Sequence, residues 1–147
     1  MQKPITAART SLNAVIVTLD NHLSGAIGRV ATALAREIPG FSFTVHAASS
    51  WASQPSSLEA CRQDIAKGDI IIVNMLFLEE HIQAVMPALL ARRENCDAMV
   101  AFMSAGEVIR LTKLGRFKMD GTQGSLVSLL KRLRGSKSSG ETSKPTA

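Results

Sequence analysis

The chain has 147 residues, of which 46% are hydrophobic and 20% charged, so we expect one domain with a proper core rather than a disordered or fibrous protein. Its two cysteines cannot by themselves form a disulfide framework or a four-ligand zinc site, and we expect a reducing, cytoplasmic location. The longest apolar stretch, residues 70–78, is too short to span a membrane.

Positive charge is concentrated at the C-terminal end. Residues 1–109 contain 8 Lys and Arg against 10 Asp and Glu, a net charge of −2. Residues 110–147 contain 9 against 2, a net charge of +7. A nucleic-acid-binding protein that is basic throughout would look different, and one Trp, five Phe and no Tyr offer few rings for stacking on bases. We therefore expect no nucleic-acid partner.

Strand-like and helix-like segments alternate from the start of the chain. Residues 12–19 are rich in β-branched side chains and predict a first strand. A helix follows, because apolar residues recur on one helical stripe until Pro39-Gly40, namely Leu23, Ile27, Val30, Leu34 and Ile38. Residues 41–47 predict the second strand.

The next helix and strand have clear boundaries. Ser56 and Glu59 match a capping box, which predicts the start of a second helix that ends at Gly68. Its inner stripe is expected to be Leu58, Cys61 and Ile65. Residues 69–74 are apolar almost throughout, as in a strand that is covered on both faces.

A third helix is expected from Glu79 to Arg93, with a kink or restart at Pro87. The side chains expected to face inward are Ile82, Val85, Met86, Leu89 and Leu90. Residues 97–103 predict the fourth strand. A second capping box, Ser104 to Glu107, starts a helix that continues through Val108, Leu111 and Leu114 to Gly115.

The hydrophobic pattern that predicts helices and strands is less clear towards the C-terminus. Residues 116–124 predict a hairpin or a loop, and residues 125–134 predict a short amphipathic helix. We expect a flexible N-terminus over residues 1–11, one α/β domain over 12–134 and a disordered basic linker over 135–147. The linker is interpreted as the point at which a longer chain is cut.

Strands alternating with helices through short connections predict an α/β fold of the flavodoxin-like, doubly wound type. We expect a parallel sheet of four or five strands, in the order 2-1-3-4, with helices on both faces. In such sheets a ligand binds beyond the carboxyl ends of the strands, between strands one and three. The residues expected there are Asp20, Asn21, His22, Asn74, Phe77, Glu79, Glu80 and His81.

Asp20, His22 and Gly25 spell D-x-H-x-x-G directly after the first strand. This pattern resembles the cobalamin-binding motif, in which the histidine coordinates cobalt and the aspartate fixes its tautomer. The rest of that motif is poorly matched, since no Gly-Gly pair is present. The alternative is that Asp20 or Asn21 caps the first helix.

Other constellations favour structural roles. Glu79, Glu80 and His81 are consecutive in a helix and cannot all converge on one metal ion. The first strand–helix turn lacks both glycine-rich phosphate-binding patterns. His46 and the two cysteines are interpreted as structural residues. We expect no catalytic residue and no metal ligand in this chain, which favours a binding or scaffold domain.

The sequence resembles one protein family over most of its length. The stretches LFLEEHI at residues 76–82 and MSAGEVIRLTKLGRF at 103–117 are the most specific, and VIVTLDNHL at 15–23 and HAASSW at 46–51 fit the same region. Over residues 12–134 they resemble the N-terminal region of the large, porphyrin-binding H subunit of magnesium chelatase. Chains of that family are several times longer, which agrees with a truncated fragment.

The resemblance implies a function for the complete protein. Magnesium chelatase inserts Mg²⁺ into protoporphyrin IX with ATP hydrolysis, in chlorophyll and bacteriochlorophyll biosynthesis. The partners implied are the remainder of the large subunit and two subunits of AAA+ type, with no cofactor in this fragment. The fragment itself is expected to be a non-catalytic docking or gating domain with an apolar loop at residues 75–78.

Two alternatives remain open. The fragment could be a stand-alone module that binds a porphyrin or a cobalamin-like tetrapyrrole through ligand-binding residues Asp20, His22, Asn74, Phe77, Glu79 and His81. It could instead be a generic α/β interaction domain without any link to metal insertion. The first alternative predicts a spectral change with a tetrapyrrole, and the second predicts no association with the large subunit.

Overall fold

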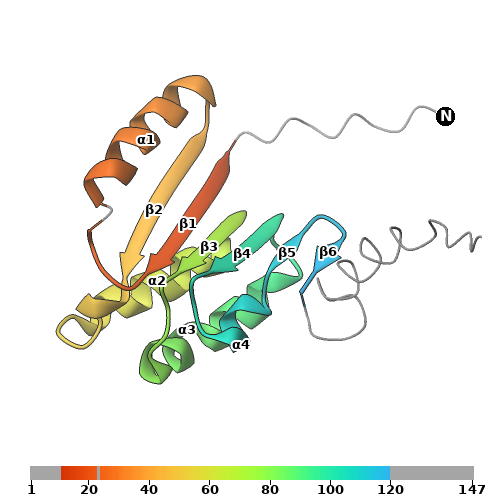
Figure 1. Cartoon of the computed structure of the whole chain (residues 1–147). Helices are drawn as coiled ribbons and strands as arrows, with labels where there is room; N and C mark the ends of the chain where they lie inside the picture. The colour runs from red at the N-terminus through yellow and green to blue at the C-terminus, as the bar shows by residue number, and fades with distance from the viewer. Residues whose placement is uncertain (1–10, 23, 120–147) are drawn as a thin grey trace, which may run out of the picture.

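The computed structural model describes residues 11–22 and 24–119, and its centre is a six-stranded sheet in the order β2-β1-β3-β4-β5-β6 (Figure 1). The first four strands are parallel, and the last two add antiparallel pairs at one edge. Their bounds are β1 Leu12–Thr18, β2 Phe41–Ala47, β3 Ile70–Asn74, β4 Ala98–Phe102, β5 Lys113–Leu114 and β6 Phe117–Lys118. The predicted α/β class and the strand order 2-1-3-4 are confirmed, with six strands rather than four or five.

Helices connect the parallel strands, as predicted. They are α1 Ser24–Glu37, the 3-10 turn η1 Ala48–Ser50, α2 Pro55–Lys67, α3 Glu79–Arg93 and α4 Gly106–Ile109. The helix α3 continues through Pro87 as one element, so of the predicted kink or restart at this proline the restart is wrong. None of the helices in the described ranges is long and apolar enough to cross a membrane.

The core lies between one face of the sheet and the helices α2 and α3. Val15, Val17, Ile71, Val73 and Met99 point from the strands into this core and are almost fully buried. The two helices supply their buried stripes, namely Cys61, Ile65, Ile82, Val85 and Leu89. These stripes agree with the predicted ones, except that Leu90 is 55% exposed because its side of α3 faces away from the core.

The helix α1 lies on the other face and is only loosely attached. It contacts β2, and none of its described side chains is buried. Of its predicted inner stripe, Ile27 and Leu34 are partly buried, whereas Val30 is 51% and Ile38 41% exposed. The prediction of this stripe is therefore only partly correct, because the helix runs along an edge strand instead of over the centre of the sheet (Figure 1).

Both predicted capping boxes are wrong. The helix α2 begins two residues earlier than a cap at Ser56 implies, with Gln54 as the N-cap residue, Pro55 at the first helical position and no side-chain cap. Proline favours that position because its fixed φ suits a helix and its missing N–H would have no partner there. The second serine, Ser104, lies outside α4, and its hydroxyl donates to the carbonyl of Phe102.

The region after α4 also differs from the prediction. The helix ends at Ile109 instead of Gly115, and Leu114 lies on β5, paired with Ala98 of β4. Gly115, at φ +57°, provides the turn to β6, so a hairpin is present but begins earlier than predicted.

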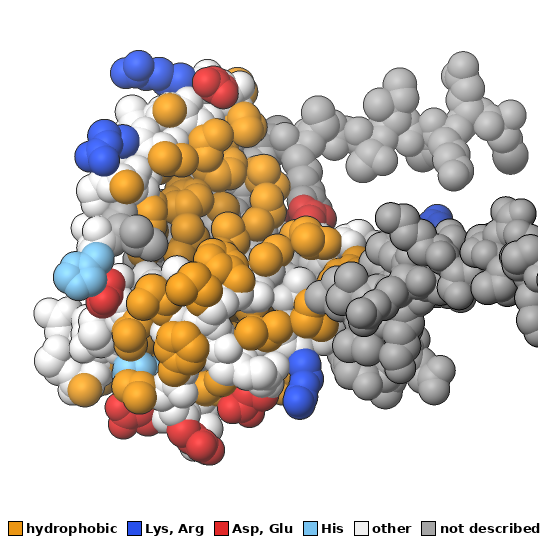
Figure 2. All heavy atoms as spheres, viewed as in Figure 1, with side chains coloured by type: hydrophobic (Ala, Val, Ile, Leu, Met, Phe, Trp, Pro, Cys, Tyr) orange, Lys and Arg blue, Asp and Glu red, His pale blue; other side chains and the backbone are white. Residues whose placement is uncertain are grey.

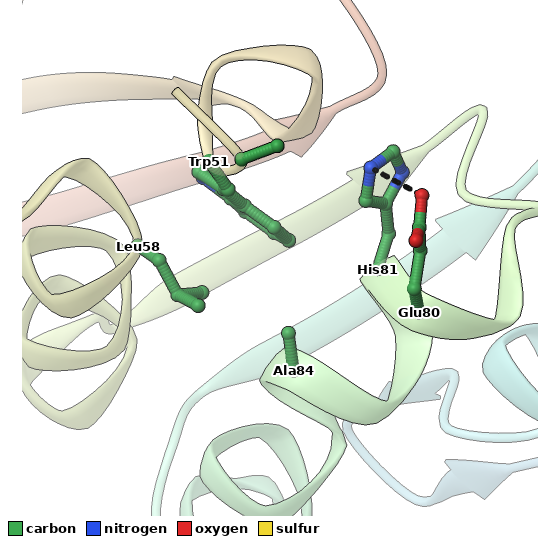
Figure 3. Close-up of a pocket in the computed structure, with 6 residues that line it drawn as sticks. Trp51, Leu58, Glu80, His81 and Ala84 are labelled. Atoms are coloured by element: carbon green, nitrogen blue, oxygen red, sulfur yellow. Dashed lines mark ion pairs between the residues drawn. The ribbon is translucent and has the colours of Figure 1, made fainter. Parts of the chain in front are cut away.

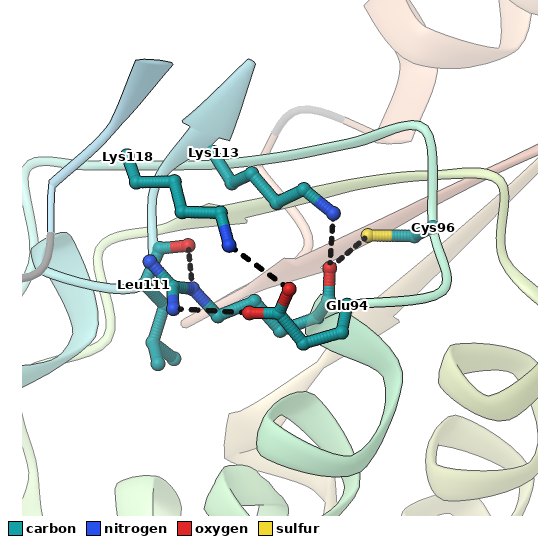
Figure 4. A network of polar contacts seen from close by, with 6 residues as sticks. Glu94, Cys96, Leu111, Lys113 and Lys118 are labelled. Carbon is teal, nitrogen blue, oxygen red and sulfur yellow. Dashed lines mark hydrogen bonds and ion pairs between the residues drawn. The ribbon is translucent and has the colours of Figure 1, made fainter. Parts of the chain in front are cut away.

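Polar contacts attach this hairpin to the end of α3 (Figure 4). The Lys118 ammonium lies 3.0 Å from a carboxylate oxygen of Glu94, and Lys113 donates to the carbonyl of Arg93. The Arg93 guanidinium donates in turn to the carbonyl of Leu111. The Lys118 contact lowers the pKa of the Glu94 carboxyl. The predicted helix at 125–134 and linker at 135–147 lie outside the described residues, as does nearly all of the predicted flexible N-terminus.

Candidate functional site

The candidate residues predicted from the sequence lie at the carboxyl ends of β1 and β3, beside the carboxyl end of β4. Thr18 of β1 pairs with Asn74 of β3, and Asn74 pairs with Phe102 of β4. The loops that follow these three residues therefore leave the sheet at the same edge. Asp20 and His22 follow β1, while Phe77, Glu79 and His81 follow β3.

Asp20 and His22 form a local turn. One carboxylate oxygen of Asp20 accepts the backbone N–H of His22 at 3.1 Å, and the other lies 3.5 Å from the His22 Nε2 atom. A side-chain acceptor two residues before the donor is a common way to stabilise a turn. The His22 side chain is 91% exposed. The pair therefore has the geometry of a turn and leaves an imidazole free to meet solvent or a ligand.

The loops after β3 and β4 are linked by Ser104. The hydroxyl of Ser104 accepts the backbone N–H of Leu76 at 3.0 Å, and the backbone N–H of Ala105 donates to the Leu76 carbonyl at 3.0 Å. Leu76 is fully buried, so its N–H needs this acceptor. The two loops are thereby fixed side by side.

Two methionines at this edge adopt a backbone conformation that non-glycine residues seldom adopt. Met75 directly follows β3 and has φ +58°, and Met103 directly follows β4 and has φ +46°. Left-handed residues of this kind cost free energy and are retained where the surrounding structure holds them. Here the Ser104 contacts provide that restraint.

The same loops expose large apolar side chains. Phe77 is 53%, Leu78 50% and Met103 64% exposed, and we call these three residues the strand-end cluster. A monomeric domain gains nothing by exposing adjacent apolar side chains on ordered loops. Such patches commonly mark a surface for another protein segment or a ligand.

A pocket of about 190 Å³ lies behind this edge, between η1, α2 and α3 (Figure 3). Its lining consists of Trp51, Ala52, Leu58, Glu80, His81 and Ala84. The Trp51 and His81 rings meet edge to face, with centroids 5.7 Å apart. Sequence reasoning did not identify this pocket, because Leu58 and Ala84 lie on helices that are far apart in the chain. The single tryptophan of the chain, directly after β2 and η1, was the available signal.

Three buried polar atoms at this end of the molecule have no hydrogen-bond partner among the described residues. They are Trp51 Nε1, His81 Nδ1 and Asn74 Oδ1. Buried donors and acceptors are usually paired, so each of these atoms is a place where water or a ligand atom would be stabilised.

The predicted residues Glu79, Glu80 and His81 diverge, as expected for neighbours in a helix. The Glu79 carboxylate accepts a hydrogen bond from Gln83 at 2.8 Å. The Glu80 carboxylate points outward, 79% exposed and 3.8 Å from the Nε2 atom of the inward His81. Within residues 11–22 and 24–119, no three His, Cys, Asp or Glu side chains gather closely enough to hold a metal ion.

The remaining histidine and the cysteines have the structural roles that were predicted. His46 Nε2 lies 2.7 Å from a carboxylate oxygen of Asp64, which fastens β2 to α2. Burial raises the pKa of the Cys61 thiol to about 12, and burial also raises that of Cys96. A thiol held protonated in this way is a poor nucleophile.

Comparisons with known proteins agree with the resemblance of the sequence. The model of a family described as "Domain of unknown function (DUF3479)" matches residues 13–146. The magnesium-chelatase H subunit of Cereibacter sphaeroides is 44% identical over 120 residues, which is 82% of this chain and 10% of that protein. The corresponding H subunit of Rhodobacter capsulatus is 37% identical over 123 residues, 84% of this chain and 10% of that protein.

A plant relative matches a shorter part. The chloroplastic magnesium-chelatase protein ChlH of Oryza sativa subsp. indica is 39% identical over 56 residues, 38% of this chain and 4% of that protein. The chain thus spans about a tenth of the length of the bacterial relatives, and the matched part is their N-terminal region.

Proposed function

Since the chain belongs to the DUF3479 family of domains, we propose that it forms the N-terminal domain of a magnesium-chelatase H subunit. The complete protein then binds protoporphyrin IX and takes part in inserting Mg²⁺ into it, with ATP hydrolysed by two partner subunits of AAA+ type. Identities of 44% and 37% over more than four fifths of the chain support this proposal.

Within the complete protein the domain acts as a head that docks on the remainder of the polypeptide and gates access to its porphyrin. The observation that carries this role is the strand-end cluster of Phe77, Leu78 and Met103, which is exposed at one edge of the sheet. Full burial of such a side chain against a partner contributes about 1.5–3 kcal/mol. The Ser104 contacts already order the two loops, so docking loses little conformational entropy.

The polar side chains of the domain stabilise its own structure, which supports a docking role without chemistry for the domain. Asp20 stabilises a turn, Glu79 is bonded to Gln83 and His46 is bonded to Asp64. Each of these groups has an internal partner that explains its position. The reaction chemistry is therefore assigned to the longer part of the complete protein and to its partners.

Docking is tested in the full-length protein with the partner subunits, ATP, Mg²⁺ and protoporphyrin IX. The double variant Phe77→Ser with Met103→Ser should lower the rate of Mg-protoporphyrin formation at least fivefold. The matched control is Leu90→Ser, because Leu90 is equally exposed but lies on α3, outside the cluster. Equal rates for both variants would contradict the docking role, as would Mg²⁺ insertion by the 147-residue chain in place of the full-length protein.

A second candidate function is tetrapyrrole binding by this domain itself. It is favoured by the exposed His22 imidazole, which lies at the same sheet edge as the exposed Phe77 ring. Protoporphyrin IX and cobalamin should each be titrated into the chain and followed by absorbance. A shift that His22→Ala abolishes and the neighbouring Asn21→Ala retains would support direct binding. Without a shift, only the docking role remains.

A further inference from the structure

The strand-end cluster has carboxylates around it. The loops after β1, β3 and β4, with the first turns of α3 and α4, carry four acidic residues, which we call the acidic rim: Asp20, Glu79, Glu80 and Glu107. These segments, residues 19–22, 75–82 and 103–109, contain no Lys or Arg. Figure 2 shows hydrophobic side chains gathered on one face, with Asp and Glu side chains at its lower border. The apolar cluster is therefore set in negative surroundings.

The rest of the described chain has the opposite charge. Residues 11–22 and 24–119 contain ten Lys and Arg and ten Asp and Glu, so their net charge is 0. The acidic rim takes four of the acidic residues, which leaves a net charge of +4 on the rest. The positive end of the α3 dipole is worth about half a charge, whereas Glu79 and Glu80 in its first turn carry two. The dipole therefore leaves this edge negative.

A buried acceptor lies at the same edge. Asn74 ends β3 and is 8% exposed, and its Oδ1 atom has no hydrogen-bond partner among the described residues. A carbonyl oxygen can only accept a hydrogen bond, and the same holds for the ionised carboxylates of the acidic rim. These groups favour a partner that supplies N–H donors and positive charge.

Apolar and acidic groups alternate closely enough to be used by one partner residue. Phe77 and Leu78 directly precede Glu79 and Glu80 in the chain, and the Glu80 side chain is 79% exposed. Lysine and arginine side chains pack their apolar stems on surfaces of this kind and keep their charged ends in water. Such a side chain can lie on the strand-end cluster and place its charge beside the acidic rim.

We propose that the strand-end cluster and the acidic rim together bind a basic amphipathic segment, in which Lys or Arg residues stand beside large apolar side chains. The segment belongs to the remainder of the longer polypeptide, since this chain spans about a tenth of its bacterial relatives. An anionic ligand is repelled by the same carboxylates. This inference rests on the proposed docking function and adds the chemistry of the docked segment.

The first test titrates two synthetic peptides into the whole 147-residue chain, with its methionine methyl groups labelled for NMR. The peptides share their leucine positions, and the other positions are lysine in one and glutamate in the other. The lysine peptide should shift the Met103 methyl signal and bind at least about tenfold more tightly at about 50 mM salt, with a smaller advantage at about 500 mM. Equal binding of the two peptides, or an unshifted Met103 signal with the lysine peptide, would overturn the proposal.

Matched variants locate the charges that are responsible. The rim variant combines Glu79→Gln, Glu80→Gln and Glu107→Gln, and the control variant combines Glu37→Gln, Glu59→Gln and Glu94→Gln. Both change the net charge by +3, but the control residues lie outside the three loops. The rim variant should remove the preference for the lysine peptide, and the control variant should retain it. Equal losses in both would reveal a general attraction between opposite charges and would overturn the proposed site.

The full-length protein separates this inference from the docking role itself. With the partner subunits, ATP, Mg²⁺ and protoporphyrin IX, the rim variant should lower the rate of Mg-protoporphyrin formation at least about threefold at low salt, and less at high salt. A rate that is lowered by Phe77→Ser with Met103→Ser but not by the rim variant would overturn the basic segment and leave the docking role. A rate that neither variant changes would overturn both.

Discussion

The two faces of the sheet are built from the same kinds of side chain but have different surroundings. Neighbouring isoleucines of β3 show this, since Ile71 is fully buried under α2 and α3 whereas Ile72, on the opposite face of the sheet, is partly exposed. The apolar character of a strand residue therefore does not determine its burial. The position of the connecting helices does, because α2 and α3 cover the centre of the sheet and α1 follows its edge.

The largest expected effect separates the helices of the two faces. Leu89→Ala on α3 should lower the free energy of unfolding by about 2–5 kcal/mol, because a fully buried side chain is lost and a cavity remains. Leu34→Ala on α1 should cost about 1 kcal/mol or less, since Leu34 is only partly buried and alanine favours helices. Urea unfolding of both variants measures the difference. Equal losses would mean that α1 is packed as tightly as α3.

The next effect concerns the loops at the carboxyl ends of β3 and β4. Ser104→Ala leaves the buried N–H of Leu76 without its acceptor, which should cost about 1–3 kcal/mol. Hydrogen exchange of the Leu76 amide should become faster in parallel. The control is Ser53→Ala, which removes only an exposed side-chain bond to the Ser50 carbonyl and should be close to neutral. An unchanged Leu76 amide would show that another group can replace the hydroxyl.

A buried group in the core on the covered face should also make the stability of the fold depend on pH. The Cys61 thiol has a pKa of about 12 in the folded chain against an ordinary value of 9.0, with burial as the main cause. Between these values the unfolded chain loses this proton and the folded chain keeps it, so stability should decrease as the pH rises above 9. Urea midpoints at pH 8 and pH 10 measure the slope. Cys61→Ala should reduce it, and an identical slope in the variant would rule out this thiol as its source.

The smallest effect is expected at the β5–β6 edge. Lys118→Met removes the contact with the exposed Glu94 carboxylate and should return the Glu94 pKa towards its ordinary value. Because that pKa is lowered in the folded chain, the contact stabilises at neutral pH and is lost as the pH falls through it. NMR titration of Glu94 measures the change, with Arg116→Met as the control at the hairpin turn. A Glu94 pKa that does not rise would contradict the contact.

Much of the architecture follows from local patterns. The four parallel strands and the helices α1, α2 and α3 were predicted because each has a clear period and is bounded by Gly, Pro or polar residues. The hairpin was placed wrongly, since a two-residue strand has no period and Leu111 and Leu114 happen to have helical spacing. Ser56 and Ser104 were misread because a capping pattern is satisfied by residue types alone, whereas a cap requires the backbone to turn there.

For the candidate site, chain order predicted which residues follow β1 and β3, because the carboxyl ends of parallel strands share one edge. It could not predict which of them come together. His22 turns to solvent and His81 turns to Trp51, a neighbour that lies thirty residues earlier in the chain. The link from Ser104 to Leu76 and the strained backbone of Met75 and Met103 likewise depend on two loops that meet only in the folded sheet.

The amino-acid sequence by itself determined the α/β class, the strand order and the family, because these depend on periodicity, on right-handed connections and on residue identity. The tertiary structure alone decided that α1 lies at the edge, that one sheet face remains partly open and that three apolar side chains stand exposed on restrained loops. Burial is a property of the contacts between elements, and no single segment specifies how much of a neighbour it will cover.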